Sequence, residues 1–550
     1  MNNLMFYTRC RPRSCNINSM KIALIAPPYP LEEAPSPPLG ICYVAAACEK
    51  AGAEVQIFDY IVRKFTPEKL EAEMRRFKPD AIGTTGVTMN AKKAIEILNT
   101  AKSINPSVIT MLGGPHASFD FENILHENKE IDIIIRGEAE ETLQELVPLL
   151  LSPDTWNSIS GVSFRENEKI INTESRPLIE NLDSLQLPSR HLLPMSRYQA
   201  LGFPVSIITS RGCPNKCIFC LGRKMVGFKV RHRSTSLVVD EIEDILSYGF
   251  EYINIADDLF TANKKRVIEF CNELKKRNLN FKWSVFARVN TVTVEILTEM
   301  KKAGCHSISF GIESGNTDML KTVRKGITLD QAREAVKACK EAGIATHASF
   351  MAGLPGESLK TLQDSENFSK ELEIEYGYHF LAPFPGTTVR DNIEDYDLEI
   401  LSDDWDLYDA DNVIVQTSHL KPEEIKLFVD NASQHIRDNW DNLNERYKKD
   451  NVSDDEHMQI AGYYRMIMIY KILSEDLIEI NSEHQGDFET ALTTLAERVA
   501  KETELETEFA RFHINDLINK GYIIYSEKEN KINFFWAHNN KTPVYSEKTG

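Results

Sequence analysis

Short apolar runs alternate with helical stretches through the first third of the chain. Candidate strands lie at 22–26, 55–59, 81–85, 108–112 and 131–135. The segments between them carry apolar residues at helical spacing, near 39–51, 67–77, 90–103 and 139–150. Apolar strands that alternate with helices predict an α/β fold whose parallel sheet is covered on both faces. We therefore expect a Rossmann-like, doubly wound domain over residues 20–175.

A second β/α series follows a proline-interrupted linker, which we place at 176–204. Its six candidate strands are 205–209, 252–256, 283–287, 307–312, 346–351 and 378–382. Six repeats predict a partial (β/α)6 barrel over 205–390 rather than a closed eightfold one. Functional side chains are expected at the carboxyl ends of strands in both kinds of sheet.

The two ends of the chain have a different character. Residues 391–550 are acidic and mainly helical, and a helical pattern at 509–519 followed by a hairpin pattern at 522–536 suggests a winged-helix-like module. Residues 1–19 are polar and basic and lack the apolar core of a secretory signal. We expect a disordered leader ahead of a natural start at Met20. The alternative is a regulatory leader that carries Cys10 and Cys15.

Composition narrows the class of protein. The chain has 82 acidic and 63 basic residues and a net charge of −19, which argues against a nucleic-acid or anionic-membrane partner. No apolar run approaches the ~18 residues that a membrane-spanning helix needs. Apart from one stretch, the cysteines are scattered, so a secreted disulfide framework is disfavoured and a cytoplasmic location is expected.

Three cysteines stand close together directly after the first strand of the second series. Cys213, Cys217 and Cys220 have the spacing C-x3-C-x2-C. A disulfide fits three thiols in one loop poorly. Structural zinc needs a fourth ligand, for which His232 is a candidate. A 4Fe–4S cluster held by three thiolates would keep one iron open, and the spacing alone leaves zinc and iron–sulfur both possible.

This motif resembles the radical S-adenosylmethionine superfamily, in its spacing, its place after a strand, and the aromatic Phe219 before the last cysteine. The resemblance implies roles at later strand ends. Asp257 and Asp258 replace the superfamily's Gly-Gly-Glu and would bind the amino group of S-adenosylmethionine, although one of them could instead cap the next helix. Arg288 suits a carboxylate or a ribose, with a surface salt bridge as the alternative.

Two further strand ends extend the resemblance. Glu313 and Ser314 stand where the superfamily contacts the ribose or methionine portion of S-adenosylmethionine. Gly353 and Gly356 belong to a segment similar to the adenine-edge motif, and glycine there permits close backbone contact. Plain turns would also use glycine, so these two positions carry less weight.

A Rossmann-like domain ahead of this barrel resembles the cobalamin-binding members of the superfamily, and the resemblance covers about 20–390. The loops that contain Gly113, Gly114 and His116, and Gly137 and Glu138, are similar to that group's cobalamin-side loops. The Asp-x-His-x-x-Gly motif that supplies a histidine to cobalt is absent from the chain. The resemblance therefore implies cobalt without a protein histidine below it, and His116 is not expected to be a cobalt ligand.

The resemblance implies an enzyme that uses a 4Fe–4S cluster to form a 5′-deoxyadenosyl radical from S-adenosylmethionine. Its partners would be a small-molecule substrate and a reducing donor such as flavodoxin or ferredoxin. Cobalamin-dependent methylation of an unactivated carbon is the expected reaction, with a radical cyclase or rearrangement enzyme as the alternative. A metal-cluster sensor or interaction protein is the non-enzyme alternative. Methylthiotransferases are disfavoured because they need three cysteines in the first domain, which holds only Cys42 and Cys48.

Overall fold

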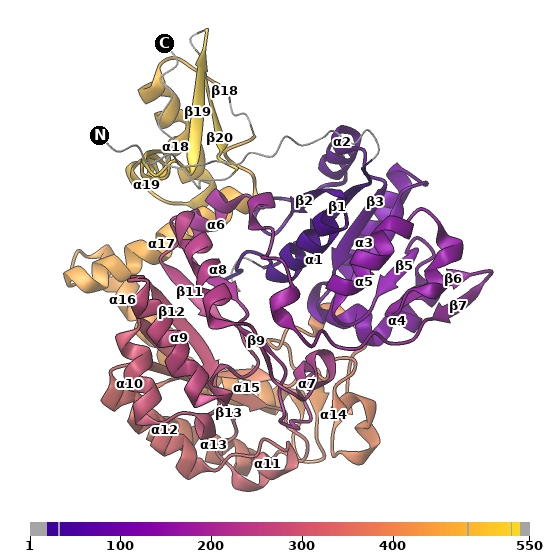
Figure 1. Cartoon of the computed structure of the whole chain (residues 1–550). Helices are drawn as coiled ribbons and strands as arrows, with labels where there is room; N and C mark the ends of the chain where they lie inside the picture. The colour runs from indigo at the N-terminus through magenta and orange to yellow at the C-terminus, as the bar shows by residue number, and fades with distance from the viewer. Residues whose placement is uncertain (1–18, 31–33, 481–482, 530, 539–550) are drawn as a thin grey trace, which may run out of the picture.

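Two helix-covered sheets form most of the molecule, and the last helices and strands of the chain (yellow) stand at one end of it, on the side of the barrel (Figure 1). The computed structural model describes residues 19–30, 34–480, 483–529 and 531–538. The expected leader and its two cysteines lie outside the described residues. Among the helices within these ranges, none has both the length and the hydropathy that crossing a bilayer requires.

The N-terminal sheet has seven strands in the order β2-β1-β3-β4-β5-β6-β7. They are β1 (Lys21–Ala26), β2 (Glu54–Asp59), β3 (Ala81–Thr85), β4 (Ile109–Gly113), β5 (Ile133–Ile135), β6 (Val162–Glu166) and β7 (Lys169–Asn172). The first five are parallel, as the sequence predicts. The antiparallel pair β6–β7 was not predicted. Strand order reverses between β1 and β3, and ligands bind beyond the carboxyl ends at such a point.

Helices cover both faces of this sheet because successive side chains of a buried strand point to opposite sides. Ile22 and Leu24 of β1 belong to one apolar core, whereas Ala23 and Ile25 belong to the other. The helices are α1 (Leu39–Lys50), α2 (Pro67–Phe77), α3 (Ala91–Ile104), α4 (Pro115–Glu127) and α5 (Ala139–Leu146). Helices α1 and α5 pack on the first core and α2, α3 and α4 on the second.

The second sheet has six parallel strands in the order β15-β14-β13-β12-β11-β8, and it does not close into a ring. The strands are β8 (Val205–Ile207), β11 (Tyr252–Ile255), β12 (Lys282–Ala287), β13 (Cys305–Glu313), β14 (Ala345–Ala352) and β15 (Glu375–Phe380). The helices are α8 (Thr235–Ser247), α9 (Lys264–Lys276), α10 (Val294–Lys302), α11 (Thr317–Thr322), α12 (Leu329–Ala342) and α13 (Leu359–Glu371). The predicted fold class, a Rossmann-like sheet followed by a partial barrel, is confirmed.

Side chains alternate between the two faces of the barrel strands. In β13, Ile308, Phe310 and Ile312 are fully buried, whereas Ser309 and Gly311 between them remain partly exposed. The apolar set packs in the largest core of the molecule. The inner face therefore presents small residues to the interior of the open barrel.

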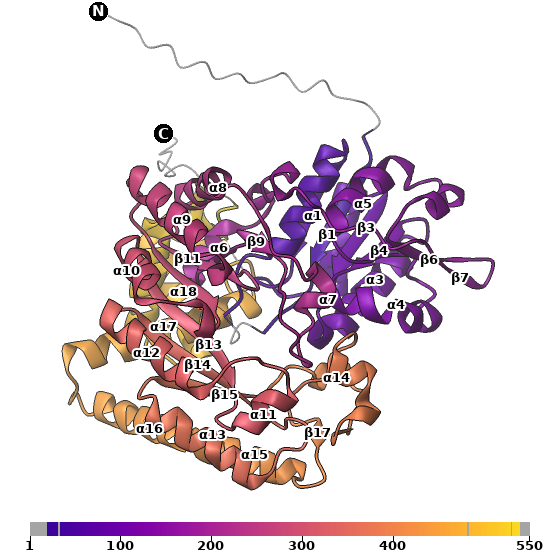
Figure 2. The same cartoon turned by 60° about the horizontal axis from the view of Figure 1, so that its bottom comes forward.

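Short elements connect the two sheets and follow the barrel. They are α6 (Met195–Leu201), β9 (Ser210–Arg211), α7 (Gly222–Val226), β10 (Arg231–His232), α14 (Thr388–Asp391), β16 (Glu399–Ile400) and β17 (Val415–Gln416). Helices α15 (Pro422–Ala432), α16 (Gln434–Lys448) and α17 (Asp454–Ser474) come next, and α15 and α16 run along the barrel beside α13 (Figure 2).

The C-terminal part ends in a three-stranded sheet with two helices. The sheet order is β18-β20-β19, made of β18 (Glu483–Gln485), β19 (Ile523–Lys528) and β20 (Lys531–Trp536), beside α18 (Phe488–Thr503) and α19 (Thr507–Asn519). Helix α19 and the β19–β20 hairpin lie where the residue pattern placed a helix and a hairpin. Strand β18 was not predicted.

Candidate functional site

The three cysteines lie in one loop, residues 212–221, which we call the cluster loop. It leaves β9 and enters α7 at one end of the barrel (Figure 1). Cys213 and Cys217 are half-buried, Cys220 is exposed, and all three are free thiols. At its start Gly212 has φ +115°, and a Cβ there would collide with the backbone of Lys229. The turn therefore requires glycine.

The three thiols do not converge on one position as the ligands of a zinc ion do. Among the described residues, no three His, Cys, Asp or Glu side chains converge on a position for a single metal ion. Structural zinc needs four such ligands around one ion. Cysteine thiolates that hold an iron–sulfur cluster are spread around a larger group. His232 is partly buried in β10, and burial lowers the pKa of its imidazole.

The cluster loop is held by backbone hydrogen bonds from two sides. The Ile218 N–H donates to the Val323 carbonyl at 3.2 Å, and its carbonyl accepts from the Val389 N–H at 3.0 Å. Phe219 packs beside this anchor, and the Lys325 ammonium lies 5.9 Å from the centre of its ring. Phe219 thus belongs to the packing that fixes the three thiols.

The two aspartates that follow β11 have different environments. The Asp257 carboxylate is buried and accepts hydrogen bonds from the Thr209 N–H, the Thr209 hydroxyl and the Ser210 hydroxyl, each at 2.6 Å. Asp258 is exposed and accepts one bond from the Gly212 N–H at 3.3 Å. A Cβ on Gly222 would lie 2.8 Å from Asp258 and 3.6 Å from the Cys220 sulfur. Asp258 therefore has free acceptor capacity beside the thiols, and Asp257 has little.

Arg288 follows β12, and Glu313 is the last residue of the neighbouring strand β13. Both are buried. An Arg288 N–H lies 3.7 Å from the Cys217 sulfur, and Glu313 pairs with the Lys325 ammonium at 2.6 Å. Glu313 also has a left-handed backbone, with φ +73°, which is uncommon for a residue with a side chain. Lys325, which the sequence reasoning missed, joins these groups to the cluster loop.

Ser314 has a different environment from its neighbour Glu313. Its hydroxyl is fully buried, 3.1 Å from the Ser365 hydroxyl on α13, and accepts from the Asn316 N–H at 3.1 Å. These contacts favour a structural role for Ser314.

The turn after β14 is organised by a buried carboxyl group that the sequence reasoning missed. Gly353 and Gly356 both have positive φ, and Glu357 accepts from the N–H groups of Gly353 at 2.6 Å and Leu354 at 3.1 Å. Burial raises the pKa of Glu357 to about 8 despite these bonds. Its second oxygen has no hydrogen-bond partner among the described residues. The two glycines allow the positive φ angles that this turn requires. With a pKa of about 8, the Glu357 carboxyl group is mostly protonated at pH 7.

In the N-terminal sheet, Gly113 is the last residue of the central strand β4 and Gly114 precedes α4. Gly114 has φ +95°, and a Cβ there would lie 2.8 Å from the Gly86 carbonyl. His116 is 2 % exposed, with its ring centre 5.1 Å from that of Trp405. Burial lowers the pKa of His116 to about 4, so its imidazole is neutral. His116 is thus a buried, neutral residue packed against Trp405, and its place beside cobalamin stays a prediction.

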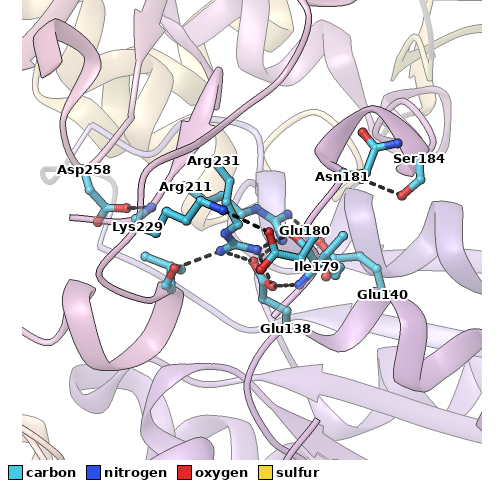
Figure 3. Close-up of polar contacts among 12 residues, drawn as sticks. Glu138, Glu140, Ile179, Glu180, Asn181, Ser184, Arg211, Lys229, Arg231 and Asp258 are labelled. Atoms are coloured by element: carbon cyan, nitrogen blue, oxygen red, sulfur yellow. Dashed lines mark hydrogen bonds and ion pairs between the residues drawn. The ribbon is translucent and has the colours of Figure 1, made fainter. Parts of the chain in front are cut away.

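The loop after β5 joins the two sheets, as Figure 3 shows. The Glu138 carboxylate accepts from Arg211 at 2.9 Å, from both terminal nitrogens of Arg231 at 2.9 and 3.0 Å, and from the Ile179 N–H at 2.8 Å. Arg211 also pairs with Glu140. Although burial raises the pKa of the Glu138 carboxyl, the hydrogen bond from Arg231 and the charge of Arg211 outweigh it and lower the pKa below its ordinary value.

This group of four side chains, Glu138, Glu140, Arg211 and Arg231, is called the interdomain ion cluster below. It engages every oxygen of Glu138, which favours a structural role for this residue. Gly137 beside it has φ +71°, and a Cβ there would meet nothing within 4 Å, so the backbone faces open space.

A second connection brings the carboxyl ends of the two sheets together. A Cβ added to Gly386, after β15, would collide with Phe119 of α4, and Trp405 lies against His116. Arg211 stands two residues before Cys213 and binds the loop after β5. The strand ends of one sheet therefore face those of the other, where ligands of both folds are expected.

Comparison with known families agrees with this division of the chain. The model of the B12 binding domain family matches residues 33–147, and that of the radical SAM superfamily matches residues 207–368. An uncharacterized methyltransferase of Pyrococcus horikoshii is 35% identical over 421 residues, which cover 75% of this chain and 91% of the relative. The anaerobic magnesium-protoporphyrin IX monomethyl ester cyclase of Cereibacter sphaeroides is 33% identical over 378 residues, covering 66% of this chain and 61% of that protein.

Solved structures show the same fold at low identity. The radical S-adenosylmethionine methyltransferase TsrM of Kitasatospora setae, with cobalamin and a [4Fe-4S] cluster bound, is 18% identical. It has a TM-score of 0.61 over 70% of this chain and 81% of that chain. The cobalamin-dependent S-adenosylmethionine radical enzyme OxsB is 19% identical, with a TM-score of 0.66 over 94% of this chain and 82% of that chain.

The interdomain ion cluster is predicted to contribute to the stability of the fold, which a substitution of Glu138 tests. Glu138→Gln removes the carboxylate that pairs with the buried Arg231 and leaves Arg211 with Glu140 alone, and breaking a buried pair costs about 3–5 kcal/mol. We expect that loss in the free energy of unfolding by urea. Glu180→Gln is the control, because Glu180 forms only an exposed pair with Lys229, which contributes ~0–1 kcal/mol. Equal stability of the two variants would contradict the analysis.

The raised pKa of Glu357 predicts how the stability of the fold depends on pH. Its pKa is raised from 4.5 to about 8 in the folded protein, so its contribution to stability is lost as pH rises from 4.5 through 8. Glu357→Gln removes this titration, and its melting temperature should decline less than that of the wild type between pH 5 and 9. Glu334→Gln, at an exposed site on α12, should keep the wild-type profile. Parallel profiles of the wild type and Glu357→Gln would refute this assignment.

Proposed function

The chain belongs to the cobalamin-binding radical S-adenosylmethionine enzymes, and from this premise we propose that it methylates an unactivated carbon of a small-molecule substrate. Its cofactors are a 4Fe–4S cluster, S-adenosylmethionine and cobalamin. When bound, these groups supply radical formation from S-adenosylmethionine and a transferable methyl group, and the protein supplies binding and orientation.

One observation supports the joint action of the two cofactors in this chain, and it applies to methyl transfer and to cyclisation alike. Glu138, in the loop after the cobalamin-side strand β5, accepts a hydrogen bond from Arg211, which directly precedes the cluster loop. A methyl donor at the first sheet and a radical source at the second must act on the same carbon. A rigid link between their two loops supports that shared geometry.

Within the barrel, Cys213, Cys217 and Cys220 would hold the cluster. Asp258 is the better candidate to bind the amino group of S-adenosylmethionine, because its carboxylate is exposed beside Cys220. Gly353 and Gly356 would bring backbone close to the adenine, on a turn that Glu357 keeps in shape without adding a charge.

A radical cyclase is the second candidate function. The cyclase relative is 33% identical, close to the value for the methyltransferase relative, and no described residue distinguishes the two reactions. Methyl transfer is preferred because the methyltransferase relative is matched over more of its length.

The electron donor is proposed to be a flavodoxin or ferredoxin that docks beside the cluster loop. Residues 184–239 contain no Asp or Glu, in a chain of net charge −19. Lys216 is exposed there, Arg223 lies over the ring of Phe228 at 5.8 Å, and Phe228 is 67% exposed, whereas the nearby Lys224 is paired with Asp391 at 2.6 Å. Helix α7, which carries part of this surface, is in front of the body of the molecule in Figure 2. An acidic partner would be steered to such a surface.

The two aspartates offer a matched test of the S-adenosylmethionine site. Asp258→Asn should weaken binding of S-adenosylmethionine about ten- to hundredfold, because a hydrogen bond to a charged group contributes about 1.5–3 kcal/mol. Calorimetric titration of the reconstituted protein measures it, with iron content unchanged. Asp257→Asn should instead lower the melting temperature, because it disturbs three buried hydrogen bonds. The reverse pattern would transfer the role to Asp257.

Product stoichiometry tests methyl transfer. Feeding cells [methyl-13C]methionine and comparing the wild type with a deletion strain identifies the labelled product. With the substrate so identified, each methylation in vitro should yield about one 5′-deoxyadenosine and one S-adenosylhomocysteine. A Cys213→Ala, Cys217→Ala, Cys220→Ala variant should form neither. Product that accumulates at constant S-adenosylhomocysteine would replace methyl transfer by cyclisation or rearrangement.

A further inference from the structure

Arg288 is a buried cation without a carboxylate partner. Its side chain is at the end of β12 and the residue is 8 % exposed. Among the described residues its hydrogen bonds go to two acceptors, the Lys325 carbonyl and the Cys217 sulfur, the latter at 3.7 Å. Its Nε has no partner within the same part of the chain. Glu313, on the adjacent strand, pairs with Lys325 instead.

An uncompensated buried cation is costly, so an anion is expected next to Arg288. The Cys217 sulfur lies at hydrogen-bonding distance for a sulfur acceptor, and as a cluster ligand it would carry negative charge. The sequence pattern instead assigned Arg288 to a carboxylate or a ribose, which belongs to S-adenosylmethionine. The two assignments make different predictions for the protein without S-adenosylmethionine. Arg288 would already contact Cys217 there in the first assignment, whereas in the second it would gain its anionic partner only when the ligand binds.

The geometry around Arg288 is fixed from both sides. The Lys325 carbonyl holds one end of the guanidinium, in a loop whose Val323 carbonyl accepts from the Ile218 N–H of the cluster loop. The Lys325 ammonium is neutralised by Glu313. Arg288 is therefore the positive charge near Cys217 that no described carboxylate offsets.

We propose that Arg288 tunes the iron–sulfur cluster by donating an N–H···S hydrogen bond to the Cys217 thiolate. Net charge and hydrogen bonds to sulfur set the reduction potential of such clusters. A fixed cation stabilises the cluster after it has accepted one electron from its donor, and therefore raises the potential. The proposal concerns the cluster alone, so it holds for methyl transfer and for cyclisation.

The test is a redox titration of reconstituted protein without S-adenosylmethionine, with dithionite as reductant and the reduced cluster followed by electron paramagnetic resonance. Arg288→Met should lower the equilibrium constant for one-electron reduction about tenfold or more, which is 59 mV towards negative potential. Arg288→Lys keeps the charge and should restore part of the shift. Arg324→Met removes an exposed charge in the neighbouring loop and should leave the potential unchanged.

Two results would overturn the proposal. A wild-type potential in Arg288→Met, together with weaker binding of S-adenosylmethionine, would assign Arg288 to that ligand. An equal shift in Arg288→Met and Arg324→Met would show a general effect of surface charge rather than a bond to Cys217. If Arg288→Met does not retain iron, Arg288→Gln replaces it, with the same negative shift expected and an unchanged potential counted against the proposal.

Discussion

The ion pairs between Glu138 and the guanidinium groups of Arg211 and Arg231 fix the N-terminal sheet against the barrel. These charges are buried, so each is stable only while its partners are present. Arg211 precedes the cluster loop, whereas Glu138 follows a strand of the other sheet. The position of the three thiols relative to the first domain thus depends largely on two carboxylates, Glu138 and Glu140. The Phe119–Gly386 contact and the Trp405–His116 contact add a second point of attachment and limit rotation about the first.

Much of the fold was predictable because buried parallel strands are continuous apolar runs. The hairpin β6–β7 was missed because its two-residue turn, Asn167-Glu168, has positive φ at both positions without the glycine that usually marks such a turn. Strand ends were less predictable than strands. β13 begins at Cys305, two residues before the apolar alternation becomes clear.

The sequence was enough to locate the cysteine motif of the candidate site. It was not enough to tell which of the neighbouring polar residues are held in internal hydrogen bonds and which are available to a ligand. The spacing of the cysteines is local, so it could be read directly. Asp257 and Asp258 are adjacent in sequence, and they differ in that Asp257 is hydrogen-bonded to Thr209 and Ser210, which lie almost 50 residues earlier in the chain. Glu138 lies in a glycine-containing loop typical of ligand binding, but its partners Arg211 and Arg231 are 73 and 93 residues away. Such pairing is set by tertiary structure.

The open edge of the barrel has an evolutionary consequence. Because β8 and β15 are not hydrogen-bonded to each other, the width of the interior is not fixed by a closed ring of strands. The residues on the inner face of β13 are small, and beside Gly311 the space is taken by the side chains of Glu313 and Lys325. New substrate shapes can therefore be accommodated by changes at the β15 side and in the C-terminal segment that follows it. The strands β8 and β11, which support the thiols and Asp258, can stay the same while substrate range diverges.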